Sequence, residues 1–221
     1  MRIKICGLFR EEDIDFVNEA CPDYIGFVFA ESKRKVTPVL AQYLRFRLAS
    51  SIVPVGVFVN ARITDIVTLY QNGIISVAQL HGEEDESYIQ ALKKASGNKP
   101  IPIIKTINNE QSTKNKVQRT KKKSELNVRE DSCSSRLNSF QTYSADYLLI
   151  DSGAGSGKSF NWDSLTSIKF PKPWFLAGGI DIKNIEKAKA LNPFAIDVSS
   201  GAETDGIKNR EKILQLTASV R

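Results

Sequence analysis

Pro54-Val55-Gly56-Val57-Phe58-Val59 is a short run that is apolar on both faces of an extended chain. Such a strand is typical of a parallel sheet that has helices on one side and a packed interior on the other. Similar short runs precede and follow it, and longer segments with helical spacing separate them. We therefore expect eight parallel strands, near residues 2–6, 24–29, 53–59, 75–80, 101–106, 146–151, 173–177 and 194–198.

The segments between these strands have the periodicity of amphipathic helices. We expect helices at Glu11–Ala20, Pro38–Leu48, Ile63–Tyr70, Asp85–Ala95, Ile182–Leu191 and from about Lys208 to Ala218. Eight strand–helix units in 221 residues leave about 28 residues for each unit, which fits a compact barrel. The sequence thus predicts an α/β protein, a (βα)8 TIM barrel that forms a single domain over residues 1–221.

One connection departs from this rhythm. Residues 107–144, between the fifth and sixth expected strands, are polar and rich in Lys, Ser, Asn and Thr, so we expect an enlarged, basic and partly mobile insertion. Within it, residues 111–136 carry eight basic and three acidic side chains, while the whole chain has a formal net charge of +6. The basicity is therefore a property of one segment rather than of the fold.

Composition also limits the partners. The run Lys121-Lys122-Lys123 has no aromatic residue interleaved with it, so we expect no nucleic-acid partner. No long apolar stretch and no secretory signal occur, which predicts a cytoplasmic protein with no membrane partner. Cys6, Cys21 and Cys133 form no C-x-x-C pair, and with one histidine they suggest neither disulfides nor a metal site.

Two groups that can transfer protons stand at the ends of expected strands. The first strand ends in Cys6-Gly7, and the run Tyr147-Leu148-Leu149-Ile150 leads into Asp151. In a parallel barrel the carboxyl ends of the strands form the face that carries the active site. From the residues alone two alternatives remain open, in which Cys6 fills the core and Asp151 caps the following loop.

The loops after the seventh and eighth strands are rich in glycine and serine. The seventh strand leads into Gly178-Gly179, with Asp181 as an expected helix cap, and the eighth contains Asp197 and leads into Ser199-Ser200-Gly201. Backbone N–H groups, hydroxyls and helix N-termini in such loops bind phosphate, and these two loops often do so in barrels. We predict a phosphate site there, with ordinary turns as the alternative.

A second glycine-rich segment, Gly153–Ser159, is similar to the end of a P-loop. Ser152 stands where the motif requires its first glycine, so we do not expect a nucleotide site.

Seven segments along the chain form a recognisable series: Lys4-Ile5-Cys6-Gly7-Leu8, Gly26-Phe27-Val28-Phe29 with Ser32-Lys33-Arg34, Val55-Gly56-Val57-Phe58-Val59-Asn60, Gln79-Leu80-His81-Gly82, Gly157-Lys158-Ser159-Phe160-Asn161-Trp162, Leu176-Ala177-Gly178-Gly179, and Asp197-Val198-Ser199-Ser200-Gly201-Ala202-Glu203. The series resembles the signature segments of the phosphoribosylanthranilate isomerases of tryptophan biosynthesis. The chain departs from that pattern at Phe9, where threonine is usual, and at Asn209, where aspartate is usual. The resemblance does not extend to the insertion.

The resemblance implies an Amadori rearrangement of N-(5′-phosphoribosyl)anthranilate, a phosphosugar, with no cofactor and no metal. It implies Cys6 as general base and Asp151 as a general acid that keeps its proton at neutral pH. It also implies Arg34 as the partner of the anthranilate carboxylate, and we expect a monomer or a homodimer. The further substrate-binding residues would be Gly157, Gly178, Gly179, Asp197, Ser199, Ser200 and Gly201.

Other interpretations of single residues remain. His81, the only histidine, is expected to order the turn after the fourth strand rather than to act in catalysis. An indoleglycerol phosphate synthase would share the phosphate loops and would use Lys105 as its catalytic lysine. A binding module that uses the basic insertion to hold RNA or an acidic protein is the rival from another functional class.

Overall fold

The computed structural model describes residues 1–108, 143–151, 162–166 and 168–221. Cys133, Gly157, the segment Gly153–Ser159 and most of the expected insertion lie outside these residues.

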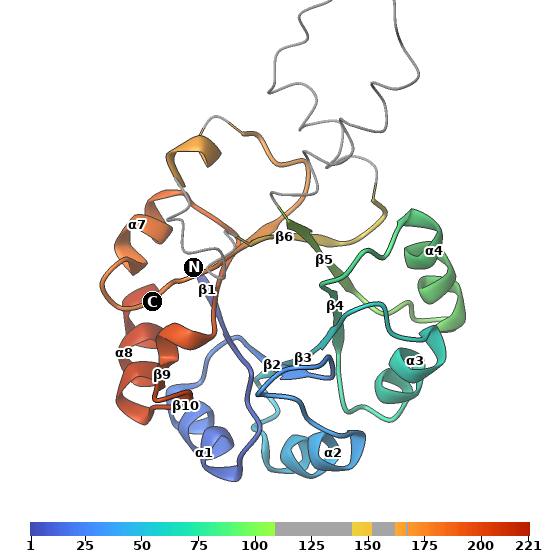
Figure 1. Ribbon diagram of the computed structural model, residues 1–221, viewed down its shortest axis with the longest axis horizontal. Coiled ribbons are helices and arrows are strands. Elements are labelled where there is room, and N and C mark those ends of the chain that lie inside the picture. Colours follow the sequence, from blue (N-terminus) through green and yellow to red (C-terminus); the bar gives the residue numbers. More distant parts are fainter. Residues whose placement is uncertain (109–142, 152–161, 167) are drawn as a thin grey trace, which may run out of the picture.

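Eight parallel strands close into a barrel in the order of the sequence, with β1 also paired to β8 (Figure 1). This arrangement confirms the expected (βα)8 fold, and each strand lies within about two residues of its expected range. The strands are β1 (Arg2–Cys6), β2 (Tyr24–Val28), β3 (Val53–Phe58), β4 (Val77–Leu80), β5 (Ile103–Asn108), β6 (Tyr147–Asp151), β7 (Trp174–Ala177) and β8 (Ala195–Val198).

Helices surround the ring of strands on its outside (Figure 1). They are α1 (Glu11–Ala20), α2 (Pro38–Arg47), α3 (Ile63–Gln71), α4 (Glu86–Ala95), α7 (Ile185–Ala190) and α8 (Arg210–Val220), with short 3-10 helices η1 (Trp162–Leu165) and η2 (Ser200–Ala202). A two-stranded hairpin of β9 (Glu203–Thr204) and β10 (Ile207–Lys208) follows η2.

Side-chain caps explain where several helices begin. The Thr37 hydroxyl accepts the Leu40 N–H at 3.1 Å at the start of α2, and the Asp85 carboxylate does the same for α4. Asn209 caps α8 by accepting the Lys212 N–H at 3.1 Å, so the departure from aspartate at this position preserves the cap.

The expected helix start near Ile182 is wrong. The Asp181 carboxylate accepts the N–H groups of Lys183 and Asn184 and so stabilises a turn, and α7 begins only at Ile185.

The pleat of the strands separates two cores. In β1, Ile3 and Ile5 face the helices, which leaves Lys4 and Cys6 facing the barrel interior. A second cluster fills the barrel interior near the amino ends of the strands. In it the ring centroid of Phe175 lies 5.5 Å from that of Tyr24, 5.8 Å from that of Tyr147 and 5.7 Å from that of Phe194. This aromatic plug closes the end of the barrel at the amino ends of the strands.

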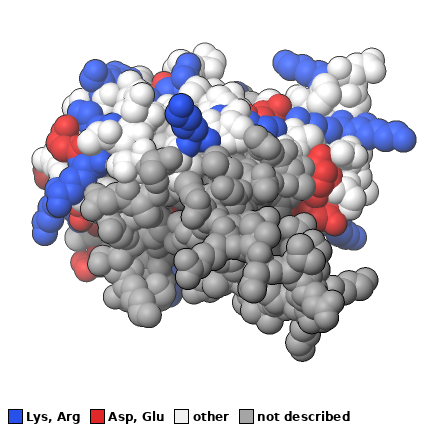
Figure 2. All heavy atoms as spheres, turned by 90° about the horizontal axis from the view of Figure 1, so that it is seen from above, with Lys and Arg blue, Asp and Glu red and all other residues white. Residues whose placement is uncertain are grey.

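Charges of both signs lie on the face of the molecule that Figure 2 draws. Figure 2 shows that blue Lys and Arg side chains on this face stand apart or next to red Asp and Glu side chains, rather than in one patch. In the described part of the chain, no helix has the length and apolar character that crossing a membrane requires.

Candidate active site

Cys6 and Asp151 both face the open end of the barrel interior. Each is the last residue of its strand, and the pleat that points Leu148 and Ile150 of β6 at the helices points Asp151 inward. The structure therefore brings the two expected proton-transfer groups to one mouth, one from β1 and one from β6.

The space around Cys6 is made by a glycine. Gly26 on β2 is the register partner of Cys6, and a Cβ at position 26 would lie 2.6 Å from the Cys6 Sγ. Any larger residue would push the sulfur from its place. On the other side the Ser199 hydroxyl donates to the Cys6 carbonyl at 3.2 Å, which connects the loop after β8 to the end of β1.

A buried ion pair lies below the thiol. The Lys4 Nζ donates to the Asp197 Oδ2 at 2.7 Å, with Lys4 fully buried and Asp197 7% exposed. Burial raises the pKa of Cys6, and the cations Lys4 and Lys208 act against that shift. Burial would lower the pKa of Lys4, but Asp197 and Cys6 raise it, so Lys4 remains an ammonium that favours the thiolate.

Asp197 keeps one acceptor available. Its Oδ1 is buried and makes no hydrogen bond to any residue in the described ranges. A buried carboxylate oxygen in this state is suited to a ligand hydroxyl, because an unmet acceptor is costly to bury.

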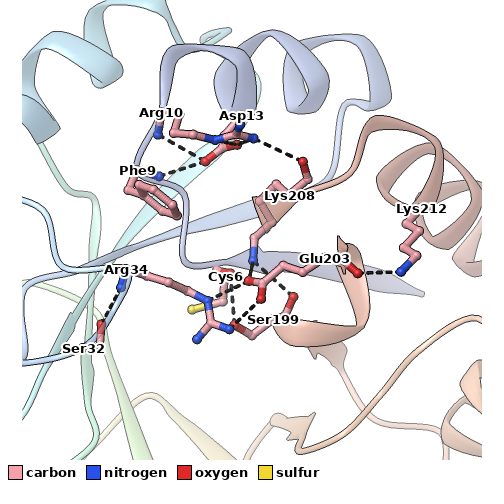
Figure 3. A network of polar contacts seen from close by, with 10 residues as sticks. All are labelled: Cys6, Phe9, Arg10, Asp13, Ser32, Arg34, Ser199, Glu203, Lys208 and Lys212. Atoms are coloured by element: carbon pink, nitrogen blue, oxygen red, sulfur yellow. Dashed lines mark hydrogen bonds and ion pairs between the residues drawn. The ribbon is translucent and has the colours of Figure 1, made fainter. Parts of the chain in front are cut away.

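Arg34 reaches the mouth from the loop after β2 and contacts Glu203 (Figure 3). Its Nε donates to Oε1 and its Nη2 to Oε2, each at 2.6 Å. Its stem passes over Gly7, where a Cβ would lie 2.5 Å from the Arg34 Cδ and where φ is +85°. Gly7 therefore leaves room for the Arg34 side chain, and the segment Lys4–Gly7 contributes to the placement of both Cys6 and Arg34.

Two site residues, Glu203 and Lys208, were assigned no role by sequence reasoning. They face each other across the β9–β10 hairpin, and the Lys208 Nζ donates to the Glu203 carboxylate and, at 3.1 Å, to the Ser199 carbonyl. Burial alone would raise the pKa of Glu203, but hydrogen bonds from Arg34 and Lys208 hold it below its ordinary value.

The sequence signal for this pair is Asp205-Gly206. Both residues have positive φ, 53° and 79°, as in a type I′ hairpin turn. That turn fixes the register that sets Glu203 opposite Lys208.

The first loop is anchored to the same hairpin. The Asp13 carboxylate accepts the N–H groups of Phe9 and Arg10, and the Arg10 guanidinium donates both to Asp13 and to the Lys208 carbonyl at 3.2 Å (Figure 3). Phe9, one of the two residues that depart from the resemblance, packs its ring partly against the core.

The loops after β7 and β8 lie against each other as a phosphate cradle would require. A Cβ at Gly201 would come within 1.9 Å of the Ile180 carbonyl oxygen, so only glycine permits this approach. Gly178 and Gly179 follow β7 directly, while Ser199, Ser200 and Gly201 lead into and form η2. The expected contribution of Gly157 falls outside the described residues.

His81 contacts the candidate acid rather than only its own turn. Its backbone N–H donates to the Phe58 carbonyl, while its Nδ1 lies 3.2 Å from the Gln79 Nε2 and 3.0 Å from the Thr106 Oγ1. Its other ring nitrogen, Nε2, lies 3.5 Å from the Asp151 Oδ2.

Lys105 is buried in an ion pair. Its Nζ donates to the Gly82 carbonyl at 2.7 Å and to the Glu84 Oε2 at 2.9 Å, and both charged side chains are 1% exposed. This buried pair argues against the catalytic lysine that an indoleglycerol phosphate synthase would need. In the described ranges, His, Cys, Asp and Glu side chains form no group of three that could hold a metal ion.

Comparisons with known proteins extend over the whole chain. A family model described as N-(5'phosphoribosyl)anthranilate (PRA) isomerase matches residues 3–129 and 108–218. The N-(5'-phosphoribosyl)anthranilate isomerase of Endomicrobium trichonymphae is 43% identical over 222 residues, which cover 100% of this chain and 98% of that protein.

Solved structures agree with these matches. The crystal structure of phosphoribosyl anthranilate isomerase from Thermus thermophilus has a TM-score of 0.74 at 30% identity and covers 100% of both chains. A crystal structure of phosphoribosyl anthranilate isomerase in complex with reduced 1-(o-carboxyphenylamino)-1-deoxyribulose 5-phosphate has a TM-score of 0.71 at 27% identity, over 98% of this chain and 96% of that one.

Proposed function

The chain belongs to the N-(5′-phosphoribosyl)anthranilate isomerase family, and from this premise we propose that it converts N-(5′-phosphoribosyl)anthranilate to 1-(2-carboxyphenylamino)-1-deoxyribulose 5-phosphate. The observation that carries the proposal is the placement of Cys6 and Asp151 at the inward-facing ends of β1 and β6, around one barrel mouth. As an enzyme of amino-acid biosynthesis it would act in the cytoplasm on a small phosphosugar, as a monomer or a homodimer.

The first chemical step is ring opening. The Asp151 carboxyl group gives its proton to the furanose ring oxygen, and the bond from that oxygen to C1′ breaks while the amine nitrogen forms a double bond to C1′. The His81 Nε2 lies 3.5 Å from the Asp151 Oδ2, where the imidazole would orient the acid.

The second step moves a proton from carbon. The Cys6 thiolate removes the C2′ proton, and the released electron pair forms a C1′–C2′ double bond and neutralises the nitrogen. C1′ then takes up a proton while the C2′ hydroxyl loses one, which produces the ketone. The Lys4 ammonium favours the thiolate form that this step requires.

The remaining residues would bind the substrate. The substrate carboxylate would contact Arg34, and the sugar hydroxyls would meet the open oxygen of Asp197. Gly178, Gly179, Ser199, Ser200 and Gly201 would supply N–H groups and hydroxyls to the phosphate. Turnover of the substrate by purified protein, followed as loss of anthranilate-type fluorescence, tests the proposal directly.

Replacement of Cys6 by Ala tests the base. We expect kcat to fall by at least about a hundredfold, since a positioned base contributes that much. Cys21→Ala is the matched control, because Cys21 is exposed at the end of α1 and its thiol donates to the Asn18 carbonyl in the same helix. Full activity in Cys6→Ala would exclude the role.

Replacement of Asp151 by Asn tests the acid. The amide keeps the shape of the side chain but has no acidic proton, so kcat should again fall by at least about a hundredfold. Asp146→Asn serves as the control, since this carboxylate precedes β6, where it accepts the Ile103 N–H and pairs with Lys93. An equal loss in both variants would point to folding rather than to proton transfer.

A further inference from the structure

The guanidinium of Arg34 is occupied along one edge only. Its Nε and Nη2 donate to the two oxygens of Glu203, each at 2.6 Å. Its Nη1 donates to no residue in the described part of the chain, and Figure 3 shows this nitrogen pointing away from Glu203. A guanidinium has two edges that match a planar carboxylate, so one recognition edge remains for a ligand.

Glu203 is itself rigidly held. Its side chain is 5% exposed, it lies on a two-residue strand whose turn fixes the register, and Lys208 donates to its carboxylate from the opposite strand. Lys212 also donates to its backbone carbonyl. An arginine bonded to so fixed a partner loses little further freedom when it binds a ligand, which improves affinity.

The charges of this group suit an anion. Arg34 and Glu203 alone would form a neutral pair, but Lys208 adds a second cation on the same carboxylate. The group of three therefore keeps one net positive charge at the rim beside Cys6.

We propose that Glu203 is a positioning residue: it holds Arg34 by the Nε–Nη2 edge and thereby presents the other edge to the carboxylate of an aromatic amine substrate. This inference rests on the proposed function and deepens it, because it makes Glu203 a determinant of selectivity for substrates that carry the carboxylate.

The test compares two substrates in one protein preparation. The first is phosphoribosylanthranilate, and the second is the same compound made with aniline, which lacks the carboxylate. In Glu203→Gln we expect kcat/KM for the first to fall by about tenfold to a hundredfold, mainly through KM, and that for the second to change little. The ratio of the two values does not depend on how much of the protein is folded.

Two further variants separate positioning from stability. Glu203→Gln leaves Lys208 buried without its carboxylate, so Glu203→Gln with Lys208→Met removes both charges together and should show the same shift in the ratio. Adding Glu203→Gln to Arg34→Ala should cause no further shift, because Glu203 acts through Arg34. Glu19→Gln, which removes an exposed partner of Arg210 on the barrel surface, should leave the ratio at the wild-type value.

The outcomes are distinct. If Glu203→Gln leaves the ratio of the two kcat/KM values unchanged, whether or not both fall, the positioning role is overturned. Turnover by the wild type would still support the proposed function in that case. Absence of wild-type turnover on both substrates would overturn the proposed function and this inference with it.

Discussion

At the scale of the residue, Cys6 shows two opposed influences on one thiol. Burial in the barrel raises its pKa, whereas the ammonium groups of Lys4 and Lys208 lower it. A base must be deprotonated to act, so activity should rise with pH as the thiolate forms. The lysines decide how far above neutrality that rise occurs.

Lys4→Met should shift this rise further from neutrality. Without the ammonium, the pKa of Cys6 moves still higher, so the ascending limb of kcat/KM against pH should move to higher pH. The rate at which iodoacetamide alkylates Cys6, located by peptide mass spectrometry, should fall at any pH below the new limb.

Lys172→Met controls for the loss of a partly buried lysine that donates to backbone carbonyls far from the thiol. If Lys4→Met and Lys172→Met gave the same pH limb as the wild type, Lys4 would have no part in activating Cys6.

At the scale of the element, the pair of Lys105 and Glu84 joins β5 to the loop after β4. Glu84 also accepts the N–H groups of Asn60 and Gly82, at 2.7 Å and 2.9 Å, so one carboxylate stabilises the ends of β3, β4 and β5 together. The pair of Lys105 and Glu84 lies on the helix-facing side of the strands, so its role is structural.

Replacing one partner of this pair should lower the free energy of unfolding more than replacing both. Lys105→Met leaves the Glu84 charge buried without its partner and should reduce the free energy of unfolding by about 3–5 kcal/mol. Lys105→Met with Glu84→Gln removes both charges and should lose clearly less, as measured by urea unfolding. A double variant as unstable as the single one would show that the hydrogen bonds of Glu84 to the backbone, not the charge pair, matter most.

Elements were predictable where the sequence signal is long. The eight strands consist mostly of apolar residues, and their length separates them from helices, so their ranges agree closely with the structure. The hairpin of β9 and β10 has strands of two residues, too short for periodicity, and only Asp205-Gly206 signals it. The start of α7 was misplaced because an aspartate stabilises an isolated turn as readily as a helix N-terminus.

At the scale of the whole molecule, closure of the barrel determines which residues meet. The positions of Cys6 and Asp151 followed from the sequence, because parallel strands end on one face and the pleat sets their direction. The contact between Arg34 and Glu203 joins residues 169 positions apart, and no periodicity encodes so distant a pairing. It exists because β8 returns beside β1 and carries the following hairpin to the loop after β2.

The aromatic plug around Phe175 has a consequence for the sugar once its ring has opened. Tightly packed side chains fill the interior at the amino ends of the strands, so neither water nor substrate can pass through the barrel at that end. Water, which would hydrolyse the open-chain imine, must therefore enter from the mouth at the carboxyl ends of the strands, where the substrate also enters. A substrate bound at the mouth would therefore keep water away from this intermediate.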